Sequence, residues 1–506
     1  MKKLVVLCSL LFLLGFFSAC GRNGSDIEYP EATVSPYTND IQNADDPELT
    51  PPPPDIPSFD HYEIILQIDP AAREVTNGIS RITFTNRTGE PLDTIVLRVF
   101  SNAFNEGTQH YFPELGPQIF RHGRDYGYMQ FQLITMNDED IVYDLAGTIL
   151  SLYPEEPLAP EQTVQLALHY NAIIPMIAHR TGANEQAMWF GMFLPVLAVF
   201  GDDGWLTPEY YPAGDSFILA MANFEVEIIT PAGYIVAGTG ENTGEITIEE
   251  TDTRVTNFIA NNVRDFAFAI SPYFQRERIS AEGVDIHLYY FTDTLPLNEI
   301  INIVNDSMEN FSDRIGLYPF DHIRIVETDM FLDSAVFSNM IFMDTAALTR
   351  PNPITLSRAL GHQWFYNVIG NNTVAEPWLH NGLVEYLVTL FFYEPELKQS
   401  VISESYSIVA GRDNLSLTNG LWAFDNWQDY HLTHHTKSML MFNALHIRMG
   451  DELFWELIRQ YFQTFYFQIA TGGDFKNLAE EIYIESLEDF FNEWFSTVTP
   501  LPINTQ

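Results

Sequence analysis

The spacing of apolar residues changes once along the chain, and this change constrains the fold more than any other sequence feature. Between residues 59 and 277, short segments such as 62–69, 78–86 and 163–170 alternate apolar with polar residues. Such alternation is typical of strands with one buried face. Beyond residue 295 the spacing becomes helical, with one strand at 323–328; helices are predicted at 296–315, 354–370, 379–393, 436–449, 451–467, 474–483 and 486–496.

The sequence therefore predicts an α+β protein with two folded domains. A β-sandwich or saddle domain is expected at 59–277, followed by a mostly helical domain with a small sheet at 278–500. The length of 506 residues agrees, because two or three domains are expected at about 150 residues per domain. An apolar content of 46% is enough for two sizeable cores.

Charge and cysteine content exclude several classes of function. The chain carries 68 acidic and 24 basic residues, so its net charge of -44 repels nucleic acid. The acids are spread along the whole chain, which indicates a solvated surface more than a dedicated site for cationic peptides. The cysteines are Cys8 and Cys20, so the predicted domains contain no disulfide, thiolate metal site or cysteine nucleophile.

The N-terminus has the pattern of an export signal. Lys2 and Lys3 precede an apolar run at 4–17, and Ser18 and Ala19 precede Cys20. This arrangement resembles the lipobox of bacterial lipoproteins, although an ordinary secretory signal remains the alternative. The resemblance implies a signal peptide at 1–19, a lipid on Cys20 that contacts the membrane, and a location in the bacterial cell envelope, on the outer side of the cytoplasmic membrane. The proline-rich and acidic segment 20–58 is expected to be an extended tether.

Two motifs in the second predicted domain resemble a known family. Residues 361–365 read Gly-His-Gln-Trp-Phe, and residues 376–379 read Glu-Pro-Trp-Leu, with Gly382 beyond them. The membrane alanyl aminopeptidase family of zinc metallopeptidases has H-E-x-x-H-Q-W-F on one helix and W-L-x-E-G on the next. Weaker matches follow the family's order at 194–195, 204–205, 214–215, 264–267, 316–320, 450–454 and 491–495. The resemblance implies a thermolysin-like (gluzincin) domain at 278–500.

The same resemblance implies a degenerate member of the family. A catalytic zinc needs three protein ligands and an open position for water. The first histidine position is Arg358, the general-base position is Ala359, and the third-ligand position is Asn381, so His362 alone survives. Alanine cannot accept a proton, and arginine brings a fixed positive charge to the metal position.

Two further family features are altered as well. The G-x-M-E-N glutamate, which holds the substrate's amino group, corresponds to Val336. The tyrosine that stabilises the oxyanion corresponds to His435, just before Lys437. Metal binding, proton transfer and amino-group binding are thus all affected.

Two interpretations of the remaining polar residues stay open. Arg358 is expected to form an ion pair with Glu385, one helical turn beyond Asn381, or to bind a peptide carboxylate. Alternatively, His362, His380 and His435 rebuild a metal site, for which His431 and His434 lie nearby in the sequence. No cofactor is expected, and zinc only if a rebuilt site involving His362 exists.

These observations leave three hypotheses for the function. The favoured one is a non-catalytic pseudopeptidase that binds peptides or a protein partner through the old active-site cleft. The second is an active metallo-aminopeptidase with a rebuilt metal site, the activity that the family resemblance implies. The third is a structural subunit of a cell-envelope assembly.

Overall fold

The computed structural model describes residues 59–106, 112–211 and 214–500. The predicted signal peptide, Cys20 and the tether lie outside these residues. Among the helices within the described ranges, none has both the length and the apolar character that a bilayer span requires.

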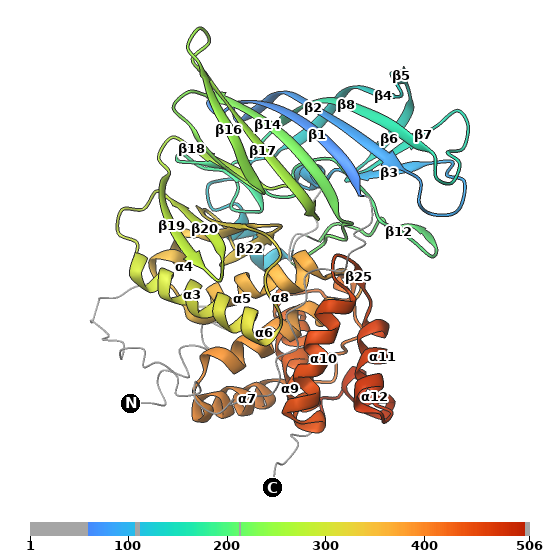
Figure 1. Cartoon of the computed structure of the whole chain (residues 1–506), viewed down its shortest axis with the longest axis vertical. Coiled ribbons are helices and arrows are strands. Elements are labelled where there is room, and N and C mark those ends of the chain that lie inside the picture. Colours follow the sequence, from blue (N-terminus) through green and yellow to red (C-terminus); the bar gives the residue numbers. More distant parts are fainter. Residues whose placement is uncertain (1–58, 107–111, 212–213, 501–506) are drawn as a thin grey trace.

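The first domain is built on an eight-stranded sheet with the order β16-β17-β14-β1-β2-β8-β4-β5 (Figure 1). Inward-facing residues alternate along its strands, as the sequence predicts; on β1 they include Tyr62, Ile64 and Leu66. β1 runs parallel to β14 and antiparallel to β2. The strands are β1 (Asp60–Asp69), β2 (Glu74–Thr85), β4 (Tyr128–Met136), β5 (Glu139–Asp140), β8 (Thr163–Ile173), β14 (Ala222–Pro231), β16 (Glu241–Ile248) and β17 (Thr253–Val263).

Two four-stranded sheets share a hydrophobic core with the large sheet. Their orders are β15-β18-β10-β9 and β11-β3-β7-β6. Leu66, Leu97, Leu150, Phe190 and Ile270 represent all three sheets in this core. The remaining elements are β3 (Ile95–Arg98), η1 (Phe100–Phe104), η2 (Pro113–Leu115), α2 (Gly116–Ile119), β6 (Val142–Ala146), β7 (Ile149–Tyr153), β9 (Thr181–Ala183), β10 (Met188–Phe190), β11 (Val196–Leu197), β12 (Phe200–Gly201), β13 (Gly204–Trp205), β15 (Ile235–Gly238) and β18 (Phe268–Ser271).

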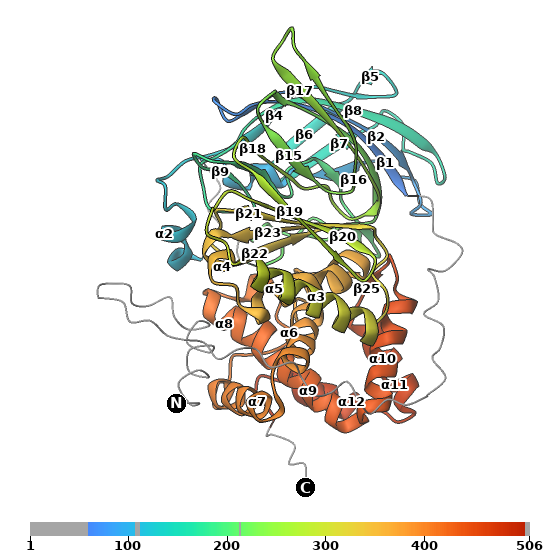
Figure 2. The same ribbon diagram turned by 60° about the vertical axis from the view of Figure 1, so that its left-hand side comes forward.

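A five-stranded sheet begins the second domain, with the order β19-β20-β21-β23-β22. It lies between the large sheet and the helices (Figure 2). The strands are β19 (Gln275–Ala281), β20 (Val284–Tyr290), β21 (His322–Thr328), β22 (Ser334–Phe337) and β23 (Met340–Asp344). Because β19 pairs with β20 in this sheet, the predicted domain boundary at 277/278 falls inside β19.

Helices form the rest of the second domain, as predicted. They are α3 (Leu297–Arg314), α4 (Thr345–Thr349), α5 (Pro353–His362), α6 (Trp378–Phe392), α7 (Pro395–Val409), α8 (Trp427–His431), α9 (Ser438–Met449), α10 (Asp451–Thr464), α11 (Gly472–Tyr483) and α12 (Glu488–Phe495), with η4 (Leu421–Ala423) and the short strands β24 (Gly370–Asn371) and β25 (Ile469–Ala470). The sequence did not predict α7, whose polar residues blur the helical pattern. The predicted helix 354–370 is α5 followed by a π-helical turn, η3 (Gln363–Val368), and a second such turn, η5 (Leu432–Lys437), precedes α9.

Arg264 connects the two domains through hydrogen bonds. Its buried guanidinium donates hydrogen bonds to four backbone carbonyls, those of Leu219, Asn367, Val368 and Gln468. Two of these carbonyls end η3, where the helical backbone has no further amide to donate to them. The chain around Arg264 therefore holds the end of the α5–η3 segment in place.

Candidate functional site

Close packing of α6 against the start of α9 positions the candidate site. A Cβ on Gly382 would lie 1.8 Å from Oγ of Ser438, so the two helices meet at a point that has no room for a side chain. Ser438 Oγ also donates a hydrogen bond of 2.8 Å to the carbonyl of Trp378. This contact brings the next turns of α6 and η5, with Glu385 and His435, face to face.

The structure brings Arg358 and Glu385 together. Nη1 of Arg358, on α5, donates to Oε1 of Glu385, on α6, at 2.6 Å. The two side chains are 20% and 13% exposed, so solvent screens them only partly. Burial works against both charges, but the mutual attraction outweighs it. The pKa of Arg358 is raised, and Arg358 and His435 hold the pKa of Glu385 well below its ordinary value.

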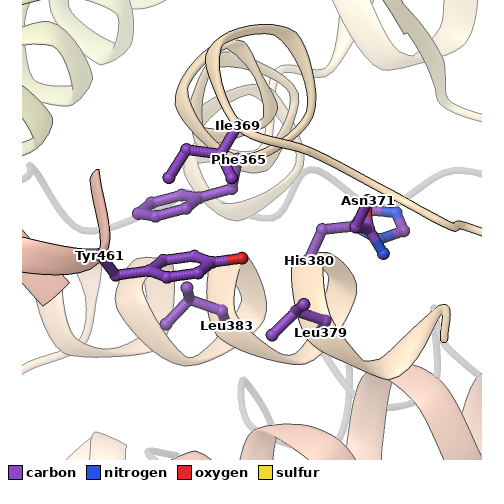
Figure 3. A pocket seen from close by; sticks show the side chains of 7 residues that line it. All are labelled: Phe365, Ile369, Asn371, Leu379, His380, Leu383 and Tyr461. Carbon is purple, nitrogen blue, oxygen red and sulfur yellow. The ribbon is translucent and has the colours of Figure 1, made fainter. Parts of the chain in front are cut away.

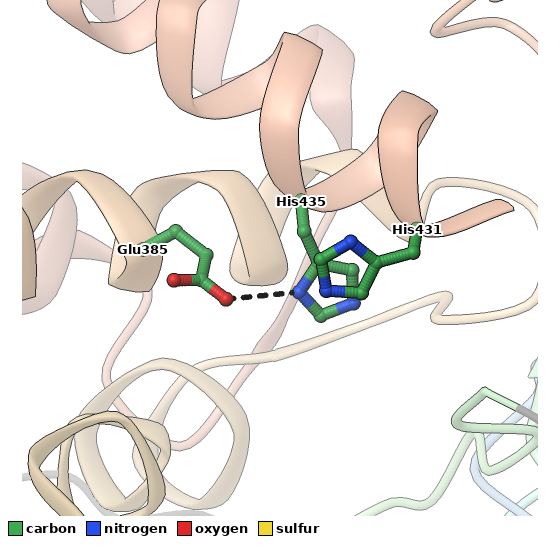
Figure 4. A group of neighbouring side chains, drawn as sticks. All are labelled: Glu385, His431 and His435. Atoms are coloured by element: carbon green, nitrogen blue, oxygen red, sulfur yellow. Dashed lines mark hydrogen bonds and ion pairs between the residues drawn. The ribbon is translucent and has the colours of Figure 1, made fainter. Parts of the chain in front are cut away.

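Two histidines complete a cluster with Glu385 (Figure 4). Nδ1 of His435 lies 3.2 Å from Oε1 of Glu385. The ring of His431 stacks on that of His435, with 4.4 Å between the ring centroids and 2° between the ring planes. One ligand atom from each of the three residues lies within 4.8 Å of the others. We call Glu385, His431 and His435 the histidine–carboxylate cluster.

Two of the family's zinc-ligand positions, His362 and Asn381, lie outside this cluster. The rings of His362 and His380 are 5.4 Å apart, and Nε2 of His380 lies 3.5 Å from Oδ2 of Asp215 without hydrogen-bond alignment. Burial, followed by the nearby His380, lowers the pKa of His362 to about 3, so its imidazole is neutral at pH 7. Nδ2 of Asn381 donates to Oη of Tyr430 at 3.4 Å.

These positions do not fit a zinc ion. Arg358 presents donors and a positive charge, Asn381 is turned toward a tyrosine hydroxyl, and His362 is the one strong ligand of the three positions. The general-base position, Ala359, lies in the apolar core, and Val336 lies on the edge strand β22. We therefore assign no chemical step to zinc at these residues.

Among the described residues, the group that converges is not the alternative rebuilt site of His362, His380 and His435. Of those three residues, only His435 belongs to the histidine–carboxylate cluster. Sequence reasoning noted His431 but gave it no role. The signal was available, because His431 and His435 are four residues apart, a spacing that places two side chains on one face of a helix.

Mostly apolar side chains fill the space beside His380, between α6, η3 and α10. The space there is too small to hold a water molecule, and Phe365 and Tyr461 stack across it with parallel rings (Figure 3). It is lined by Phe365, Ile369, Asn371, Leu379, His380, Leu383 and Tyr461. A ligand therefore does not fit into this space.

Solved structures identify the architecture. The M1 zinc metallopeptidase from Deinococcus radiodurans superposes with a TM-score of 0.65 at 17% identity, over 88% of this chain and 95% of that one. The chain has the fold of the M1 zinc metallopeptidases. An alanine-substituted form of a two-domain M1 zinc metallopeptidase, bound to L-tryptophan, gives the same TM-score and coverage.

Sequence comparisons support the same relationship to the M1 fold. Aminopeptidase Q of Acinonyx jubatus is 22% identical over 236 residues, Aminopeptidase O of Homo sapiens 21% over 234, and Aminopeptidase N of Escherichia coli (strain K12) 24% over 218. The matches cover 41%, 38% and 38% of this chain but only 24%, 29% and 24% of those relatives. No protein-family model matches the chain. The resemblance to the membrane alanyl aminopeptidase family is confirmed.

Proposed function

We propose that this chain is a non-catalytic pseudopeptidase, held at the bacterial cell envelope by a lipid on Cys20. It binds peptides or a protein partner through the surface around Arg358 and the histidine–carboxylate cluster. The observation that carries this proposal is the ion pair between Arg358 and Glu385. A guanidinium stands at the first zinc-ligand position and is held there by a carboxylate.

The missing groups act together in peptide hydrolysis, where they activate the attacking water. Without a metal ligand set, no Lewis acid activates water at the family's position. Without an acceptor at Ala359, no side chain there removes the proton from that water. Losing both removes the nucleophile and its activation together.

The fold and the exposure of the site support a binding role. A related M1 zinc metallopeptidase from Deinococcus radiodurans has been solved bound to a Tyr-Ser-Ala substrate, at a TM-score of 0.64 to this chain. Arg358, Glu385 and His435 are each partly exposed here, so a peptide's polar ends can form hydrogen bonds with them. A partly exposed ion pair offers both a donor for a carboxylate and an acceptor for an amino group.

The second candidate is an active metallo-aminopeptidase with a rebuilt metal site. The histidine–carboxylate cluster favours it, because two imidazoles and a carboxylate are a ligand set that catalytic zinc uses. This candidate requires turnover that depends on His431 and His435.

Hydrolysis of aminoacyl chromogens by the purified full chain, with one equivalent of zinc added, separates the two candidates. We expect no turnover above the protein-free blank. Turnover that disappears in His435→Gln would overturn the non-catalytic proposal. Titration with a fluorescently labelled Tyr-Ser-Ala peptide tests binding directly, and saturable binding without cleavage is the expected result.

A further inference from the structure

We infer that Glu385, His431 and His435 form a binding site for a divalent transition-metal ion of the zinc class, at a place distinct from the family's zinc position. Glu385 lies four residues beyond Asn381 on α6, which displaces it about 6 Å along the helix axis. Both histidines come from the α8–η5 segment, which supplies none of the family's zinc ligands. This inference goes beyond the proposed function and does not depend on it.

The donor atoms match the chemistry of such an ion. Zinc takes imidazole nitrogens at about 2.0–2.1 Å and carboxylate oxygens at about 2.0–2.2 Å, which places tetrahedral ligand atoms about 3.4 Å apart. Nδ1 of His435 and Oε1 of Glu385 are 3.2 Å apart, close to that separation. The three ligand atoms lie within 4.8 Å of one another, so a contraction of at most about 1.4 Å completes the set.

His431 provides the movement that this contraction needs. Its ring is stacked parallel to that of His435, and its other ring contact is with Trp427, 6.0 Å away. In the described part of the chain, no hydrogen bond to a protein group fixes the ring of His431. The second side-chain torsion of histidine is broad, so the ring can turn a nitrogen toward Glu385 at little cost.

The protonation of the cluster favours metal binding at neutral pH. Burial lowers the pKa of both histidines, and their mutual proximity lowers that of His431 further. Neutral imidazoles keep the lone pair that a metal requires, and Glu385 is ionised. The ligands therefore need to lose few protons when the ion binds.

Arg358 is the group that opposes the ion, and it provides the sharpest test. Its guanidinium donates to Oε1 of Glu385 at 2.6 Å. Ligating carboxylates commonly accept hydrogen bonds from neighbouring groups, so Arg358 can remain as a partner of Glu385. Its charge nevertheless repels a cation at this distance, so removing it should tighten binding.

The test is calorimetric titration of ZnCl₂ into the chelator-treated full chain, with Co²⁺ absorption as a second readout of coordination. We expect one equivalent of tight binding. His431→Gln and His435→Gln, which keep a polar side chain of similar reach, should each weaken it by about 100-fold. His380→Gln is the matched control and should leave the affinity unchanged. Arg358→Met should tighten binding by about tenfold.

Two outcomes would overturn the inference. One is the absence of a stoichiometric site for either ion. The other is equal affinity in the wild-type chain and in the double His431→Gln/His435→Gln variant, which would assign the binding to surface carboxylates. Thermal unfolding of each metal-free variant shows whether it is folded before it is titrated. Zinc binding without hydrolysis leaves the non-catalytic proposal standing, whereas hydrolysis that requires His431 supports the metal site and overturns that proposal.

Discussion

Replacing Glu385 with glutamine leaves the guanidinium of Arg358 without a carboxylate at 2.6 Å in a largely buried setting. Glutamine keeps the size of the side chain and still accepts hydrogen bonds from Arg358 and His435. The substitution therefore removes charge and little else. It tests whether the ion pair holds α5 against α6 in the place where the family binds zinc.

The magnitude follows from the burial of the two charges. Breaking a buried ion pair by removing one partner costs about 3–5 kcal/mol, because the other charge stays buried without compensation. Exposures of 20% and 13% leave some solvent access, and Asp333 gives Arg358 a second, weaker attraction. Both effects place the expected loss of unfolding free energy at the lower end, about 3 kcal/mol.

Urea unfolding of a double-mutant cycle measures the pair directly. The cycle uses Glu385→Gln, Arg358→Met and the double variant, and we expect the double variant to be more stable than Glu385→Gln. The coupling energy should reach about 1.5 kcal/mol or more. Asp285→Asn is the matched control, because its ion pair with Arg278 is much more exposed; that loss should stay below about 1 kcal/mol.

Simple additivity would refute this reasoning. If the two single losses sum to the double loss within about 0.5 kcal/mol, the charges do not act as a pair. A loss in Glu385→Gln no larger than that of the Asp285→Asn control would have the same meaning.

Two further predictions concern packing and pH. Gly382→Ala should lower the free energy of unfolding by about 1–3 kcal/mol, because the new Cβ would lie 1.8 Å from Ser438 Oγ. Gly233→Ala is the control and should change this free energy little, because a Cβ there meets no atom within 4 Å. Equal urea midpoints for the two variants would contradict the close-packing argument. The free energy of unfolding should also fall as the pH drops below 6.5. Burial lowers the native pKa of several histidines, among them His362, His431, His434 and His435. Unfolding exposes these side chains, which then bind protons, so a lower pH favours the unfolded state. Each proton bound on unfolding contributes up to about 1.4 kcal/mol per pH unit. Asp265 opposes the effect with one proton, because burial raises its pKa to about 7. A urea midpoint that stays constant from pH 7 to pH 5 would contradict this prediction.

Much of the fold was predictable because it depends on local spacing. Alternation at 62–69 gives β1, and helical spacing at 296–315 gives α3, since each pattern needs one buried face and little else. The sequence did not predict helix α7, because its helical pattern is weak. The predicted boundary at 277/278 lies inside β19, because the sequence of a strand does not say which sheet it joins. The π-helical turns η3 and η5 have no such periodic signal.

The sequence by itself predicted which groups the family's zinc position lacks, and it predicted Glu385 as the partner of Arg358. Arg358, Ala359 and Asn381 are positions on two helices whose motifs anchor the alignment, so their chemistry could be assessed without coordinates. One helical turn separates Glu385 from Asn381, which was enough to predict that Glu385 faces Arg358.

Only the tertiary structure decided which histidines meet Glu385. The contact of Gly382 with Ser438 sets the distance between α6 and the segment that carries His431 and His435. That distance depends on packing between elements some 50 residues apart in sequence, and no local pattern encodes it. Spacing within a helix is fixed by backbone geometry, whereas the approach of two helices is fixed by the side chains between them.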